Sequence, residues 1–149
     1  FPTRRSSDLV EILDGIHNFG TGVVRASTAA DTFKIALYTS SATLDASTTA
    51  YTTSGETTGT GYTAGGNTLT VSVVPTSSGT TAYLSFSNTS WTTATITARG
   101  ALIYNSSSVN YTNPAVAVLD FGSDKSSSAG NFTIQFPSAD ASNAIIRIA

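Results

Sequence analysis

The sequence contains no cysteine and no methionine, and only 11% of its residues are Asp, Glu, Lys or Arg. Without cysteine, neither disulfide bonds nor a thiolate metal site can stabilise the fold. No apolar run approaches the roughly 18–20 residues that a transmembrane helix needs, so we expect no contact with a membrane. Because the net charge is −2 and basic residues number only seven, we expect no nucleic acid partner.

Residues that carry catalysis are equally scarce. His17 is the only histidine, no Gly-x-Ser-x-Gly motif is present, and the two glutamates, Glu11 and Glu56, lie far apart in the chain. General acid–base chemistry needs such groups in pairs, and glycoside hydrolysis needs two carboxylates in one cleft. We therefore predict a protein that is not an enzyme and has no catalytic residues, no cofactor and no metal site. A depolymerase-like activity is the weakest of the alternatives.

Serine and threonine are abundant instead, with 26 Thr and 22 Ser. Threonine is β-branched and favours strands, so this composition points to an all-β protein whose solubility depends on hydroxyl groups. Alternating apolar residues predict strands at 33–38, 68–74 (ended by Pro75), 80–87, 93–104, 115–121, 131–136 and 144–148. We expect a hairpin loop between 121 and 131, with aspartates accepting turn amides. Five glycines within 55–66 predict bulges or turns with positive φ.

Seven or eight short strands separated by turns are typical of a β-sandwich, a jelly roll or a small barrel. The predicted fold is an antiparallel β-sandwich or jelly-roll-like domain. One short helix precedes it, because Leu9, Ile12, Leu13 and Ile16 fall at i, i+3, i+4 and i+7. Residues 1–9 differ in composition from the rest of the chain and read Phe-Pro-Thr-Arg-Arg-Ser-Ser-Asp-Leu. They resemble a translated sequencing adapter, and the alternative is a disordered tail. The predicted single domain covers residues 10–149.

Five residues are candidates for contact with a partner. Tyr51, Tyr62, Trp91 and Tyr111 lie in loop-like segments and would suit stacking on a glycan, although burial of Trp91 in the core is the favoured interpretation. Arg99 lies mid-strand on the side opposite Ile96. Two interpretations of it stay open, a solvent-facing charge that discourages sheet association and an inter-subunit ion pair with an aspartate.

Several stretches together resemble small virion proteins of tailed bacteriophages. The matching stretches are Gly-Ile-His-Asn-Phe at 15–19, residues 31–45, Gly-Thr-Gly-Tyr-Thr-Ala-Gly-Gly at 59–66, Ala-Arg-Gly-Ala-Leu-Ile-Tyr at 98–104, residues 115–122, Phe-Thr-Ile-Gln-Phe-Pro at 132–137 and Ile-Ile-Arg-Ile at 145–148. The likeness covers about residues 10–149. It lies in the succession of these stretches and in their general composition rather than in a chemical motif.

The resemblance implies a non-enzymatic structural protein of the virion, most of all a capsid decoration or cement protein. A tail-associated protein and a glycan-binding or adhesive module are the alternatives. It also implies a homo-oligomer, with a trimer favoured, that is assembled in the host cytoplasm and contacts capsid or tail proteins and, in the adhesive case, a host-surface glycan.

Overall fold

The structure is a computed structural model that describes residues 30–108 and 111–149. The predicted helix at 9–16 and His17 lie outside these residues. The described part is all-β, with two antiparallel sheets and no helix, which confirms the predicted fold class at that level. The strands are β1 (Phe33–Tyr38), β2 (Asn67–Leu69), β3 (Val71–Ser78), β4 (Thr81–Phe86), β5 (Thr89–Asn105), β6 (Ala115–Ile134) and β7 (Ile146–Ile148).

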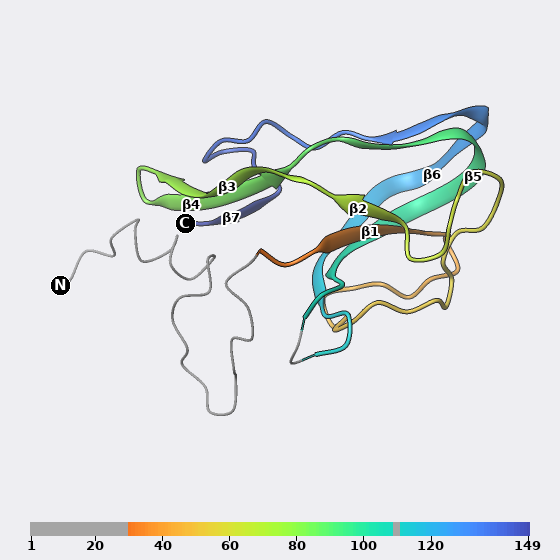
Figure 1. Cartoon of the computed structure of the whole chain (residues 1–149), viewed down its shortest axis with the longest axis horizontal. Helices are drawn as coiled ribbons and strands as arrows, with labels where there is room; N and C mark the ends of the chain where they lie inside the picture. Colours follow the sequence, from red (N-terminus) through yellow and green to blue (C-terminus); the bar gives the residue numbers. More distant parts are fainter. Residues whose placement is uncertain (1–29, 109–110) are drawn as a thin grey trace. The chain divides into compact units, whose positions relative to one another are not determined.

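The described residues form two compact units, each with one sheet (Figure 1). The larger unit, residues 30–69 and Thr89–Ile134, holds the four-stranded sheet in the order β2-β1-β5-β6. The smaller unit, Thr70–Asn88 and Gln135–Ala149, holds the three-stranded sheet in the order β3-β4-β7. Leu69 and Val71 therefore belong to different sheets, and the prediction of one continuous strand over 68–74 is wrong.

Strand β1 lies at the centre of the larger sheet, between β2 and β5. Its last four residues, Ile35 to Tyr38, are all buried, so both of its faces are covered. Ile35 pairs with Ile103 on one face, and Ala36 pairs with Leu102 on the other. The alternation in the sequence predicts a strand here, but it does not reveal that both faces are buried.

Strands β5 and β6 form a long antiparallel ribbon of 17 and 20 residues. The prediction of two short strands joined by a hairpin loop is wrong, because β6 continues through the whole segment. Gly100 pairs with Asp120 and Ala98 pairs with Lys125, so four residues of β6, Phe121 to Asp124, lie opposite Arg99 alone. This wide bulge replaces the expected loop.

The β5–β6 ribbon folds back on itself. Phe121 and Phe132 are eleven positions apart in β6, which is about 36 Å along a straight strand. Their ring centroids are nevertheless only 6.5 Å apart. Bulges bend strands and increase their twist, and the register of this ribbon shifts at four places. The fold-back brings Trp91, Ile96 and Phe132 into the core of the larger unit.

Pro75 does not end a strand, as the sequence pattern predicts, but lies inside β3. A proline cannot donate a hydrogen bond to a neighbouring strand, and it is tolerated where the strand is at a sheet edge or bulged. Strand β3 meets both conditions, since it is an edge strand and its register against β4 shifts between Val73 and Thr76. Val74, beside the proline, is 69% exposed.

Candidate functional site

The densest polar cluster of the larger unit surrounds the carboxylate of Glu56. Tyr51 donates its phenol hydrogen to Oε2 at 2.7 Å, and Tyr62 donates to Oε1 at 2.7 Å. The backbone N–H of Gly65 also donates to Oε1 at 2.7 Å. The phenol oxygen of Tyr62 in turn accepts the Leu37 N–H at 2.9 Å. Both carboxylate oxygens are therefore occupied by donors from the same chain. We call this set, with Tyr38 and Tyr104, the Glu56 cluster.

Two further tyrosines attach the cluster to the sheet. The ring of Tyr104, on β5, stacks on that of Tyr51 with centroids 4.7 Å apart, and its hydroxyl donates to the Gly65 carbonyl at 2.8 Å. Tyr38, at the end of β1, donates its hydroxyl to the carbonyl of Thr52. These contacts hold the long Ser/Thr- and Gly-rich connection between β1 and β2 against the two central strands.

The electrostatics of the cluster keep its phenols neutral. Burial raises the pKa of Tyr38 to about 12, and burial together with the hydrogen bond to Glu56 raises the pKa of Tyr51 and of Tyr62. Burial and the nearby Glu56 charge also raise the pKa of Tyr104. A phenol with a raised pKa is a hydrogen-bond donor rather than a nucleophile. The arrangement therefore suits a structural clamp.

The glycines beside the cluster confirm the expected positive-φ turns. Each of the five glycines in the 55–66 segment has a positive φ. Gly66 is the most restricted, because a Cβ there would lie 1.8 Å from the Ile35 carbonyl oxygen. Only glycine allows the chain to approach β1 so closely at a left-handed φ of +69°.

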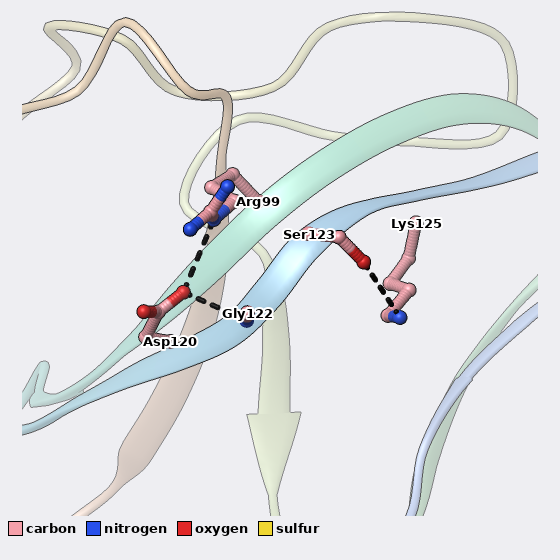
Figure 2. Close-up of polar contacts among 5 residues, drawn as sticks. All are labelled: Arg99, Asp120, Gly122, Ser123 and Lys125. Carbon is pink, nitrogen blue, oxygen red and sulfur yellow. Dashed lines mark hydrogen bonds and ion pairs between the residues drawn. The ribbon is translucent and has the colours of Figure 1, made fainter.

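Arg99 and Asp120 form the second polar feature, at the wide bulge of β6 (Figure 2). Arg99 Nε donates to Asp120 Oδ1 at 3.1 Å, and the Gly122 N–H donates to the same oxygen at 2.8 Å. The Gly122 amide and then Arg99 lower the pKa of Asp120. The Lys125 ammonium donates to the Ser123 hydroxyl at 2.9 Å. Arg99 is thus solvent-facing, with its side chain 42% exposed, and its aspartate partner in this chain is Asp120.

Of the four aromatic residues predicted as glycan contacts, three lie close together in the structure and the fourth lies apart from them. Tyr51 and Tyr62 share Glu56, and the Tyr62 ring lies 5.9 Å from that of Trp91. Trp91 lies on β5 and is only 3% exposed, as the favoured core interpretation predicts. Tyr111 is 66% exposed, and no described ring contact joins it to the other three. These residues do not make one exposed aromatic patch.

Hydroxyl groups cover the outer face of the β5–β6 ribbon and bond to one another across it. Thr97 and Ser126 are joined at 2.8 Å, and Ser90 and Thr133 at 2.7 Å. The middle of the ribbon borders a shallow, open depression lined by Thr39, Thr58, Thr95, Ile96, Thr97 and Ser127. No lining residue is charged, so the depression offers no group for acid–base chemistry.

Sequence reasoning missed Glu56, Tyr38 and Tyr104 as members of one cluster. The available signal was a lone glutamate between Tyr51 and Tyr62 in a segment that is otherwise uncharged. Within the described residues, no three His, Cys, Asp or Glu side chains are placed to hold a metal ion. The same part of the chain has no helix that is long and apolar enough to span a bilayer. Comparison with protein-family models, curated proteins and solved structures finds no match.

Proposed function

We propose that this chain is a non-enzymatic structural protein of a tailed-phage virion, with capsid decoration or cement as the leading role. The observation that carries the proposal is the internal use of the polar groups. Glu56 is held by Tyr51, Tyr62 and Gly65, and Asp120 by Arg99 and Gly122. Both oxygens of Glu56 accept hydrogen bonds that hold a loop, and a carboxylate used in this way supports a scaffold better than a reaction centre.

The hydroxyl-covered ribbon supports the same role. Its cross-strand Ser/Thr pairs give a polar outer surface with few charges, which suits a protein on the outside of a particle. In this proposal the domain is an antiparallel β-sandwich or a jelly roll, with a short helix at residues 9–16. It is a homotrimer located in the virion that contacts capsid proteins, and a place in the tail is the alternative. It binds neither nucleic acid nor membrane.

Two observations test the proposal. The first is the oligomeric mass of the purified chain by light scattering, and the second is the identity of the genes that neighbour its own in the genome. We expect an oligomer of closed symmetry at micromolar concentration and a capsid or tail gene as neighbour. Co-expression with that neighbouring protein should bring the chain into the sedimenting particles. A strict monomer that stays in the supernatant contradicts the proposal, and sedimentation with tail rather than head assemblies selects the tail role.

Glycan binding is the second candidate, and the exposed ring of Tyr111 favours it. Aromatic rings stack on sugar faces, and hydroxyl-bearing neighbours such as Ser108 and Thr112 can add hydrogen bonds. A glycan array probed with the native chain and with Tyr111→Ala tests this candidate. Binding that Tyr111→Ala removes supports it, and a flat array eliminates it.

A further inference from the structure

The shallow depression beside the β5–β6 ribbon is built from four separate segments of the larger unit. Strand β5 contributes the stretch 95–97, and the other lining residues are Thr39 directly after β1, Thr58 in the β1–β2 connection and Ser127 in β6. The volume is about 260 Å³, just below the roughly 300–1,000 Å³ of sites that enclose drug-sized molecules. The depression therefore has room for one small ring with its substituents.

The segment that carries Thr58 is fixed against β5. The Thr95 N–H donates to the Thr60 carbonyl at 2.9 Å, and the buried hydroxyl of Thr57 donates to a β5 carbonyl at 2.8 Å. Gly59 allows this approach, because a Cβ there would collide with the Thr95 carbonyl oxygen. This side of the depression is thus in place before any ligand binds, so little ordering entropy is lost on binding.

The lining hydroxyls of the ribbon are held in place by irregular backbone. Thr93 and Ala129 have φ values of +52° and +47°, which residues other than glycine rarely adopt. The Ala129 N–H donates to Thr95 Oγ1 at 2.9 Å, and Ser127 Oγ donates to the Ala94 carbonyl at 2.8 Å. Strained residues concentrate at binding sites, and bulges re-aim the side chains beside them. Here they fix the hydroxyls of Thr95 and Ser127.

These hydroxyls keep hydrogen-bonding capacity for a ligand. Thr95 Oγ1 accepts the Ala129 N–H, so its own hydrogen is free to donate. Ser127 donates its hydrogen, so the lone pairs of its oxygen are left as acceptors. Thr58 is exposed, and its hydroxyl has no hydrogen-bond partner among the described residues. Three side chains from three segments therefore offer both donors and acceptors to one small space.

We propose that this depression binds one neutral sugar residue at the end of a glycan. No lining residue is charged, so a phosphate or carboxylate would meet no cation there. Ile96 is only 3% exposed, so an apolar ligand would bury little apolar surface. A sugar ring carries several hydroxyls that each donate and accept, which matches Thr58, Thr95 and Ser127. The inference goes beyond the virion role, does not rest on it, and concerns a site other than Tyr111.

NMR titration of the isotope-labelled chain with the methyl glycosides of glucose, galactose, mannose and N-acetylglucosamine tests the site. We expect at least one of them to shift the amide signals of Thr58, 95–97 and Ser127. The dissociation constant should be on the order of millimolar, because a shallow site encloses only part of its ligand. Thr58→Val keeps the shape and removes the free hydroxyl, so it should raise the dissociation constant about fivefold. Thr53→Val, the same change at another exposed threonine of this connection, should leave it unchanged.

Three results overturn the proposal. The first is the absence of saturable shifts with all four glycosides up to about 100 millimolar. The second is an equal dissociation constant in the native chain and in Thr58→Val, with the fold of the variant checked through the buried Trp91. The third is a set of shifts that lies around Tyr111 and disappears in Tyr111→Ala, which supports the second candidate function instead. Oligomeric mass and particle sedimentation test the virion role independently, so the two proposals fail separately.

Discussion

Tyr62 and Glu56 are joined by a 2.7 Å hydrogen bond in which the phenol donates to Oε1. The same phenol oxygen accepts the Leu37 N–H, so a continuous chain of donors runs from the backbone of β1 to the carboxylate. The Glu56 carboxylate also accepts hydrogen bonds from the Tyr51 hydroxyl and the Gly65 N–H. This one side chain therefore fixes both ends of the segment 51–65. The stability of this part of the fold should depend on that carboxylate.

Replacement of Glu56 by Gln should therefore destabilise the larger unit. An amide nitrogen is a donor, so at least one phenol or the Gly65 amide loses its acceptor. We expect the free energy of unfolding to fall by about 1–3 kcal/mol in urea denaturation. Asp124→Asn, the same change at an exposed side chain, should alter it by less than about 0.5 kcal/mol. Equal effects of the two substitutions contradict the clamp.

Alkaline pH should unfold the protein through the same cluster. The pKa of Tyr38 is about 12 in the fold, above the ordinary value of 10.0, so the unfolded chain releases its proton first. The stability from this group is present below pH 10 and decreases as the pH rises from about 10 to 12. Urea midpoints measured across this window should fall, and Tyr38→Phe should flatten the decrease. A midpoint that is constant up to pH 11.5 contradicts this prediction.

Gly66→Ala should be far more damaging than Gly122→Ala. Both glycines have a positive φ, +69° and +74°, so both substitutions carry about 1–2 kcal/mol of backbone strain. At Gly66 the added methyl also meets the Ile35 carbonyl, whereas at Gly122 nothing lies within 4 Å. We expect the Gly122 variant to remain folded and the Gly66 variant to lose more than about 4 kcal/mol or fail to fold. Thermal unfolding of the pair measures the difference.

The Arg99–Asp120 ion pair can be tested by titration. The Gly122 amide contributes most to the lowered pKa of Asp120, and Arg99 contributes less. In Arg99→Gln the pKa of Asp120, followed by carboxyl NMR, should rise but stay below its ordinary value of 3.8. A full return to that value contradicts the assigned role of Gly122. Light scattering of the same variant tests the inter-subunit interpretation of Arg99, which predicts a change of oligomeric mass.

Local patterns predicted the local structure well. The alternation in Phe33–Tyr38 predicted β1 with the bounds that the structure has, and the glycines of 55–66 predicted positive-φ turns. The errors arose where tertiary context overrides a local signal. Pro75 is normally a strand breaker, but the register shift at an edge strand accommodates it. Asp120 accepts the Gly122 amide as expected of a turn, yet the turn is a bulge within β6.

The Glu56 cluster could not be predicted, because its members come from distant parts of the chain. Tyr51 and Tyr104 stack across 53 positions, and nothing in the sequence near either residue encodes that contact. A lone glutamate among Thr and Gly is ambiguous until the sheet brings Leu37 and Gly65 beside it. The hydroxyl pairs of the ribbon likewise depend on a register that four shifts determine.

The wide bulge of β6 has a kinetic consequence. Pairing of β5 with β6 can begin where Tyr104 meets Ala115, because that contact closes the shortest loop. Zipping must then halt at Phe121 to Asp124, where the regular ladder is interrupted. Beyond that point pairing resumes with Ala98 and Lys125, and it must first cross four residues of β6 that lie opposite Arg99 alone. We expect the ribbon to fold in two stages, a fast one on the near side of the bulge and a slow one that waits for the core to form.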